Sequence, residues 1–461
     1  MFPTSLLWDT IATRHDRQAR RKKTHRYRVL QNTQHRPAGP QVETLEARHL
    51  LATFGSDTFG YLGDDEAPFS FEDISGTPAN NLNLGDDTFV QVALPFPFEF
   101  YGTTYNDIFV SDNGLLTFGS GVAGTTFKDN QDLTAGGSNV TQPVIAPFWD
   151  DLSPVDGGNM DTDNVYAQEL GTADLDQRMV IQWHDIRHFA FFTNTFDFQV
   201  ALFASGDIEF RYDRVTGINN NPANGEVVDE GASSTVGIRD AEPAAPGNGH
   251  VLQYSFDMAS LMDGQAIRFF NGNNTDPVIP GQDDPDDDII VRRNGTNTQF
   301  IEVEIDGTVV ATYHEATLNS LTIDGNDGDD TLTVDLVNGN PIPPAGIHFD
   351  GGAPTVTPGD KLIVDASGTN ANTYDITDID YNATDVGEGN LDIDGSLITF
   401  TGLEPVSLLA PMATLDINIM DALPHTITLE DDAGAMAGIS FVDLDGGPPR
   451  PQAESPAAAE R

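Results

Sequence analysis

Cysteine is absent from all 461 residues of the chain. Its absence excludes disulfides, thiolate metal sites and cysteine nucleophiles at once. It assigns no compartment, because a large exported β-protein can bury enough apolar surface without covalent cross-links. No run of about 18 apolar residues occurs either, so we expect no membrane-spanning helix. Stability must therefore come from packed cores, with bound ions as a possible addition.

Basic residues are scarce and unevenly distributed. The chain has 22 Lys and Arg against 72 Asp and Glu, and residues 1–48 hold 10 of the basic residues and only 4 of the acids. Residues 49–461 therefore carry 12 basic and 68 acidic residues, a net charge of −56. Such a surface repels nucleic acid and anionic membranes, and it attracts divalent cations or basic partners. The alternative is that the acidity only maintains solubility.

The common catalytic signatures are also missing. The sequence contains no HExxH, no GxSxG and no GxxxxGK[ST], and no GxGxxG lies between a strand and a helix. His184 and Asp185 are adjacent and could pair as a base and its orienting carboxylate. In a regular strand, however, neighbouring side chains point to opposite faces, so we predict that these two diverge.

Glycine, proline and phenylalanine are abundant instead, with 44, 28 and 27 copies, and no helix-period repeat of leucines is present. This composition favours many short strands joined by tight turns, and the predicted fold class is all-β. Residues 199–212 alternate apolar and polar positions around Ser205-Gly206-Asp207, which predicts a β-hairpin. Asp112-Asn113-Gly114 lies between alternating apolar residues and predicts a second hairpin.

A group of segments in residues 54–271 carries a family resemblance. FPFEFYG, VSDNGLLTFG, VIAPFWDDL, VIQWHDI, GDIEFRY and TVGIRD occur in this order. The series resembles nidogen-like (NIDO-type) extracellular domains and their bacterial relatives. The resemblance implies an antiparallel β-sandwich over residues 53–271 and a role in adhesion or in matrix or surface assembly. The aromatic residues of these segments are expected in its core.

Residues 1–52 are predicted to form a disordered targeting segment. A basic cluster at 20–28 precedes VETLEARHLLA at 42–52. The latter resembles the short signature near the N-termini of planctomycete exported proteins, with Ala47 in place of the usual proline. No apolar h-region of an ordinary secretory signal precedes it. The resemblance implies export to the cell surface or the extracellular space.

A second domain is expected after an acidic segment. Residues 272–288 are rich in Asn, Pro and Asp, which predicts an extended linker. Short apolar runs separated by Gly/Asp turns follow over residues 289–445 and predict either a β-solenoid or a second β-sandwich. The Pro- and Ala-rich residues 446–461 are expected to be a disordered tail.

Two groups of aspartates are candidate Ca²⁺ ligands. Residues 325–333, GNDGDDTLT, resemble the calcium-binding nonapeptide of RTX-type β-rolls, and a broken second copy follows at 351–363. The resemblance implies hard oxygen ligands in adjacent turns. The candidates are Asp327, Asp329, Asp330 and Asp360, with Asp150 and Asp151 after Phe148-Trp149 as a second group. The alternative in each case is a solvated turn.

These observations predict an exported, non-enzymatic adhesion or structural protein of the cell surface or extracellular matrix. Its expected partner is an extracellular protein or a glycan, and Ca²⁺ is its candidate cofactor. The alternative function is that of a secreted hydrolase that acts on polysaccharide through carboxylates of the first domain, with Asp150 and Asp151 as the candidate pair. A purely structural coat subunit is a third possibility.

Overall fold

The computed structural model describes residues 53–445 except 122–126, 136–138, 155–163, 173–175, 191–194, 218–226, 242–249, 283–285, 353–358, 369–371, 386, 410–413, 420–425 and 432–438. Within these residues the regular structure is almost entirely strand, and the helical segments are single 3-10 turns at Pro78–Asn80 and Asp229–Gly231. The predicted all-β class is confirmed. The predicted targeting segment and the predicted tail lie outside the described residues.

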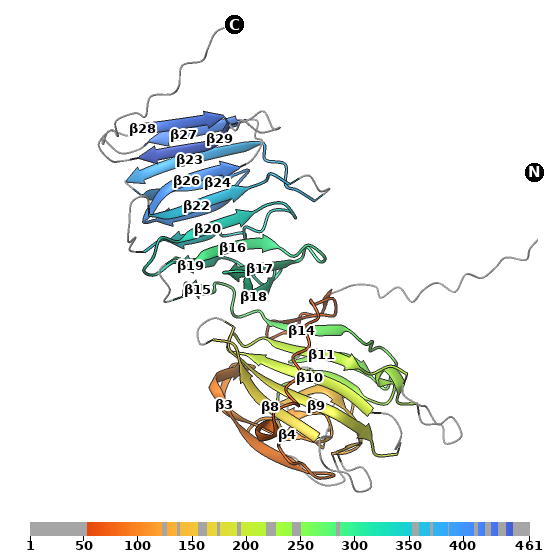
Figure 1. Cartoon of the computed structure of the whole chain (residues 1–461). Helices are drawn as coiled ribbons and strands as arrows, with labels where there is room; N and C mark the ends of the chain where they lie inside the picture. Colours follow the sequence, from red (N-terminus) through yellow and green to blue (C-terminus); the bar gives the residue numbers. More distant parts are fainter. Residues whose placement is uncertain are drawn as a thin grey trace, which may run out of the picture. The chain divides into compact units, whose positions relative to one another are not determined.

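Two antiparallel sheets form the first domain (Figure 1). In the first sheet the strand order is β1-β2-β14-β11-β10-β9-β7, and β8 also pairs with β9. Its strands are β1 (Thr53–Phe54), β2 (Tyr61–Asp64), β7 (Leu152–Ser153), β8 (Asn164–Leu170), β9 (Arg178–His188), β10 (Thr195–Phe203), β11 (Ile208–Arg214) and β14 (Gln265–Asn271).

The second sheet has the order β13-β12-β6-β5-β4-β3. Its strands are β3 (Phe89–Phe100), β4 (Thr103–Ser111), β5 (Leu116–Thr117), β6 (Val144–Trp149), β12 (Thr235–Arg239) and β13 (Val251–Phe256). Both predicted hairpins are present, because β10 pairs with β11 and β4 pairs with β5 in antiparallel register. The turn chemistry of these segments was therefore a sufficient guide to their pairing.

Aromatic side chains fill the space between the two sheets. The aromatics of the segments that carry the family resemblance are all buried, as predicted. Phe109, just before one of these segments, was also expected in the core but is half-buried, and its ring centroid lies 5.8 Å from that of Phe89. Polar tips of core aromatics bridge the sheets. The Trp183 indole donates to the Ser111 carbonyl at 3.0 Å, and the Tyr212 hydroxyl donates to the Pro147 carbonyl at 2.7 Å. These bonds satisfy buried polar groups within an otherwise apolar interior.

Parallel pairing distinguishes the second domain. One of its sheets has the order β15-β19-β21-β25-β24-β23-β27, and the other has the order β18-β17-β16-β20-β22-β26. The strands of the first are β15 (Val278–Pro280), β19 (Leu321–Asp324), β21 (Ile347–Asp350), β23 (Asp378–Asp385), β24 (Glu388–Ile393), β25 (Ser396–Thr401) and β27 (Thr414–Ile419). Those of the second are β16 (Asp288–Arg293), β17 (Phe300–Ile305), β18 (Thr308–His314), β20 (Thr331–Asp335), β22 (Asp360–Asp365) and β26 (Leu403–Leu409).

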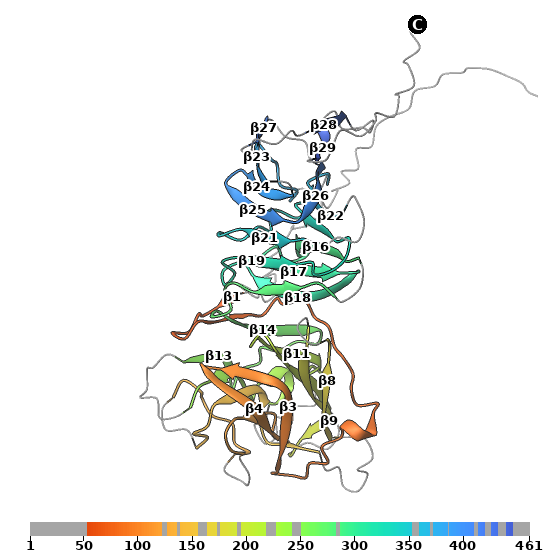
Figure 2. The ribbon, with the colours of Figure 1, turned by 90° about the vertical axis from the view of Figure 1, so that its left-hand side faces the viewer.

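The chain alternates between these two sheets, so each pair of strands makes one coil. The coils are β15-β16, β19-β20, β21-β22 and β25-β26, and each strand pairs in parallel with its equivalent in the next coil. Figure 2 shows β19, β21 and β25 on one side of the stack and β16 and β22 on the other. Of the two predicted alternatives, the structure is the β-solenoid, whose coils stack their apolar faces.

Aliphatic ladders form the solenoid core. Leu332 lies between Ile289 and Leu362 in the parallel register, and all three are completely buried. The prediction of an extended linker over residues 272–288 is partly wrong, because Val278–Pro280 forms β15 of the first coil and pairs with β19. Ile279 is buried there, which explains why the acidic composition around it did not keep the segment out of the fold. A last hairpin joins β28 (Thr426–Asp431) to β29 (Ile439–Asp445).

Contacts also link β14 with the hairpin β17-β18. The Phe270 ring lies 5.7 Å from the Phe300 ring and 5.5 Å from the His314 imidazole, centroid to centroid. His314 is almost completely buried, and its Nε2 lies 3.6 Å from a carboxylate oxygen of Asp64.

Among the residues described, no helix has the length and apolar character needed to cross a membrane.

Candidate functional site

Asp150 and Asp151 follow β6, where protein donors surround them. The Ser233 hydroxyl and the backbone N–H of Asp151 both donate to the Asp150 carboxylate, and His188 Nε2 lies 3.4 Å from it. The Lys128 ammonium lies 3.1 Å from Asp151 Oδ2. Burial raises the pKa of Asp151, although Lys128 opposes this effect. A lysine thus lies where a bound cation would have to contact Asp151.

The turn at residues 112–114 holds a further carboxyl group, that of Asp112. Asp112 is completely buried and accepts the N–H groups of Asp87 at 3.0 Å and Thr88 at 2.9 Å. Burial raises its pKa to about 8 in spite of these bonds. Gly114 has φ +72°, and a Cβ there would lie 1.8 Å from the Phe148 carbonyl oxygen.

The turn and the segment after β6 are also tied to each other. The Asn113 side-chain oxygen accepts the N–H of Leu152 at 2.8 Å, and its backbone carbonyl accepts the N–H of Asp150 at 3.2 Å. Asp112 has a raised pKa, as general acids do, but its complete burial keeps it from a substrate. Chemically, this arrangement holds two loops together and does not present an acid-base pair. Sequence analysis missed Asp112 because the Asn-Gly signal was read only as a turn.

His184 and Asp185 lie on the same side of β9, so the prediction that they diverge is wrong. His184 Nε2 is 3.4 Å from Asp185 Oδ2, and its Nδ1 is 2.8 Å from Asp197 Oδ1. Arg214 binds both carboxylates, and Thr195 donates to Asp185 at 2.9 Å. We call these five residues the His184 cluster.

A β-bulge explains the convergence. The β9-β10 register shifts between Phe196 and Phe198, so two residues of β9 lie opposite Asp197, and Asp185 has φ +48°. The hydrogen bond to Asp197 raises the pKa of His184. Burial works to raise the pKa of Asp185, but Arg214 and Thr195 lower it overall. Each ring nitrogen of His184 faces a carboxylate, so the cluster is a closed ion-pair network and not a nucleophile-base pair.

Three aspartates stack on one edge of the solenoid, each at the start of a β-strand or one residue before it. Asp287, Asp330 and Asp360 are 2%, 0% and 0% exposed. The backbone N–H of Asp287 donates to Asp330 Oδ1 at 2.7 Å, and that of Asp330 donates to Asp360 Oδ1 at 2.8 Å. We call this column the aspartate ladder. The aspartate ladder therefore hydrogen-bonds each turn of the solenoid to the next.

Glycines make room for the ladder. A Cβ on Gly281 would lie 2.6 Å from Asp287 Oδ2, and one on Gly325 would lie 2.7 Å from Asp330 Oδ2. Gly351 stands in the same relation to Asp360 at 2.8 Å. The same pairing of glycine and aspartate thus recurs in three successive turns, whereas the fourth turn has Gly402 followed by Leu403.

Stacked carboxylates disfavour ionisation. Burial, reinforced by neighbouring aspartates, raises the pKa values of Asp330 and Asp360 to about 6. The Oδ2 atoms of both residues are buried and make no hydrogen bond with the described residues. Asp327 is exposed and Asp329 is half-buried outside the ladder. The structure therefore brings together only two of the four candidate ligands of this locus.

The residues present fit Ca²⁺ in one respect and not in another. Asp330 Oδ2 and Asp360 Oδ2 accept no hydrogen bond from the described residues. Carboxylate oxygens of this kind are the hard ligands that Ca²⁺ selects. Within the described part of the chain, however, no three acidic or histidine side chains converge as a metal-binding group. Backbone carbonyls of the turns would have to supply the remaining ligands.

Comparison with known proteins identifies the first domain. A family model described as NIDO related matches residues 64–275, which run from the last residue of β2 to just beyond β14. No curated protein and no solved structure matches the chain. The nidogen-like resemblance is thereby confirmed for this segment, and residues 64–275 form a NIDO-related domain.

Proposed function

We propose that the chain is an exported, non-enzymatic protein of the cell surface or extracellular matrix, with a role in adhesion or in structural assembly. The observation that supports this most is the NIDO-related match over residues 64–275. The solenoid adds support, since stacked coils make a regular spacer of about 4.8 Å per coil. In this role the sandwich offers its loops to a partner and the solenoid holds it away from its attachment point.

The carboxylate environment supports a non-enzymatic role. Asp112 is inaccessible, and the carboxylates of Asp150 and Asp151 are engaged by Ser233 and Lys128. A retaining or inverting hydrolase needs an exposed acid and an exposed base or nucleophile across one cleft. Purified full-length chain should therefore release no reducing sugar from polysaccharides. Turnover that disappears in the double variant Asp150→Asn/Asp151→Asn would establish the hydrolase instead.

The cellular location is the test of the proposal as a whole. Intact producing cells would be treated with a protease that does not enter them, and the chain would then be detected with an antibody to the sandwich. We expect degradation on intact cells or recovery of the chain in the medium. A chain protected until the cells are broken would contradict the proposal.

Calcium is a second part of the proposal. Asp330 and Asp360 are the residues that would hold Ca²⁺, which would neutralise the ladder and add the free energy of binding to the stability of the fold. The supporting observation is the two buried Oδ2 atoms without hydrogen bonds among the described residues.

We expect Ca²⁺ to raise the melting temperature of the full chain relative to EDTA, and Asp360→Ala to remove that increase. Asp276→Ala is the control, because exposed Asp276 bonds Asn319 and Ser320 and its loss should act equally in both buffers. If Ca²⁺ leaves the melting temperature of the wild-type chain unchanged, the ladder is a hydrogen-bonding device only.

A further inference from the structure

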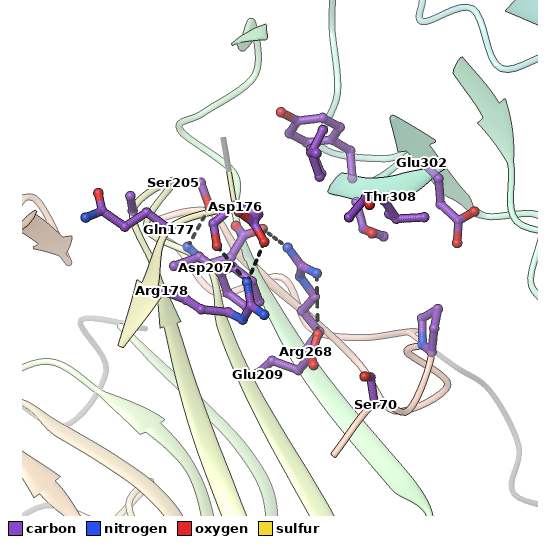
Figure 3. A pocket seen from close by; sticks show the side chains of 18 of the residues that line it. Ser70, Asp176, Gln177, Arg178, Ser205, Asp207, Glu209, Arg268, Glu302 and Thr308 are labelled. Atoms are coloured by element: carbon purple, nitrogen blue, oxygen red, sulfur yellow. Dashed lines mark hydrogen bonds and ion pairs between the residues drawn. The ribbon is translucent and has the colours of Figure 1, made fainter. Parts of the chain in front are cut away.

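A cavity of about 340 Å³ opens beside the first sheet of the sandwich (Figure 3). It is lined by the segment around Glu72, by residues of β9, β11 and β14, and by residues 308–313 of β18. Its volume lies in the range of small-molecule sites, about 300 to 1,000 Å³. None of the candidate residues discussed above lies in its wall.

One wall of the cavity is a continuous series of ion pairs. Arg211 donates to Glu72 at 2.6 Å and to Glu209 at 2.6 Å. Arg268 reaches between Glu209, at 3.4 Å, and Asp207, at 2.8 Å, as Figure 3 shows. We call this series, together with Arg178, the charged wall.

Arg178 extends the charged wall at its other end. It donates to Glu72 through Nε at 3.0 Å and binds Asp176 at 2.7 Å. Burial works against ionisation of Glu72, but its bonds to Arg178 and Arg211 lower its pKa overall, so it is charged at neutral pH. The wall therefore presents fixed guanidinium donors and carboxylate acceptors side by side.

The concentration of arginine here is unusual for this chain. Residues 49–461 contain only 12 Lys and Arg, and Arg178, Arg211 and Arg268 are three of them. Solubility does not explain these arginines, because they line a cavity. Stability does not explain them either, because buried ion pairs add little net stability compared with apolar packing. A wall of alternating donors and acceptors is, in contrast, what recognition of a polar ligand requires.

The facing wall carries an apolar patch beside the polar residues Glu302, Thr308 and Thr312. Val309, Val310 and Tyr313 of β18 line it, and Val309 is 40% exposed, which is high for a valine. On the side of the charged wall, Phe203 of β10 adds a ring, with the Arg268 guanidinium 4.5 Å from its centroid. The cavity thus offers hydrogen-bonding groups along the charged wall and apolar side chains, chiefly on β18, against which carbon can pack.

We propose that this cavity binds a neutral sugar unit of a glycan, which deepens and rests on the proposed adhesion function. A pyranose has hydroxyl groups on its rim and C–H groups on its faces, so it matches both walls. Vicinal hydroxyls donate to carboxylates such as Glu72 and accept from guanidinium groups such as that of Arg178. Carboxylates of the lining outnumber its arginines, so the cavity disfavours uronic acids and other anions.

The test measures binding of the full chain to neutral cello-, malto-, xylo- and manno-oligosaccharides, with oligogalacturonate as the anionic probe. Saturation-transfer NMR would identify binders and calorimetry would give their Kd. Val309→Trp is designed to fill the cavity without touching an ion pair. Val278→Trp is the matched control, because Val278 is 60% exposed on β15 and is not part of the lining.

We expect at least one neutral oligosaccharide to bind, Val309→Trp to weaken it at least tenfold, and Val278→Trp to leave its Kd unchanged. The assignment is overturned if no neutral oligosaccharide binds, if oligogalacturonate binds more tightly than all of them, or if Val309→Trp leaves the Kd unchanged while circular dichroism shows the variant folded. Protease sensitivity on intact cells is independent of this cavity, so these results leave the test of the proposed location separate.

Discussion

Two groups of carboxylates, one in the sandwich and one in the solenoid, are held in opposite ways. In the sandwich, Glu72 and Asp197 each contact an arginine. In the solenoid, Asp330 and Asp360 stack on each other with backbone N–H groups as their hydrogen-bond donors. The comparison shows that net charge alone does not predict the effect of removing one carboxylate. What matters is whether the carboxylate faces a cation or another carboxylate.

The largest expected effect concerns the turn at residues 112–114, which joins β4 to β5 in the second sheet of the sandwich. Gly114→Ala places a Cβ 1.8 Å from a backbone oxygen at φ +72°, and we expect it to lower the free energy of unfolding by about 4 kcal/mol or more. Gly264→Ala is the control, because Gly264 has φ +77° with no heavy atom within 4 Å of the added carbon. It should cost only about 1 kcal/mol. Chemical denaturation measures both, and equal losses would contradict the role of the close contact.

A core substitution should separate the two domains. Leu332→Ala removes a completely buried side chain from the aliphatic ladder, and we expect a loss of about 2 to 5 kcal/mol in the solenoid. Trp149 and Trp183 lie in the sandwich, and the third tryptophan, Trp8, lies outside the described residues. With Trp8→Phe as the background for both chains, tryptophan fluorescence follows the sandwich while circular dichroism follows all strands. The dichroism transition should fall and the fluorescence transition should stay. A fluorescence transition that falls equally would show that the two domains unfold as one unit.

The smallest expected effect concerns the His184 cluster. The pKa of His184 is raised in the folded chain, so its contribution to stability is complete below about pH 6.5 and is lost as the pH rises through the folded value. Asp197→Asn should bring the His184 pKa down, as measured by NMR titration of the imidazole. The loss of stability at pH 6 should be at most about 1 kcal/mol, the usual size for a partly exposed ion pair. A pKa unchanged by this substitution would show that Asp197 does not hold the imidazolium.

Local features were predictable from the sequence, but contacts and strand register between segments far apart in the chain were not. The hairpins around Gly206 and Gly114 followed from turn residues and alternation, which act within a few positions. The bulge at Asp185 left no signal in VIQWHDI, so a regular strand was assumed and His184 and Asp185 were wrongly predicted to diverge. The physical reason is that a bulge is set by register with the neighbouring strand.

The ladder and the charged wall were missed for the same reason. Asp287 belongs to an acidic run that composition alone assigns to a linker, and only the stacking of coils places it against Asp330, 43 residues away. Glu72 meets Arg211 across 139 residues. Contacts of this kind depend on the completed topology, whereas candidate ligands such as Asp330 and Asp360 could be found because glycines flank them at a recognisable spacing.

The most direct test compares two charge-removing substitutions at pH 7.5 in EDTA. Glu72→Gln leaves two arginines without their shared partner and should lower the fluorescence-detected stability of the sandwich by about 2 kcal/mol. Asp330→Asn keeps a hydrogen-bond acceptor but removes a charge whose folded pKa is raised to about 6, so it should stabilise the solenoid by roughly 1 to 3 kcal/mol. Opposite signs are the predicted result, and a loss of stability in both variants would contradict the account.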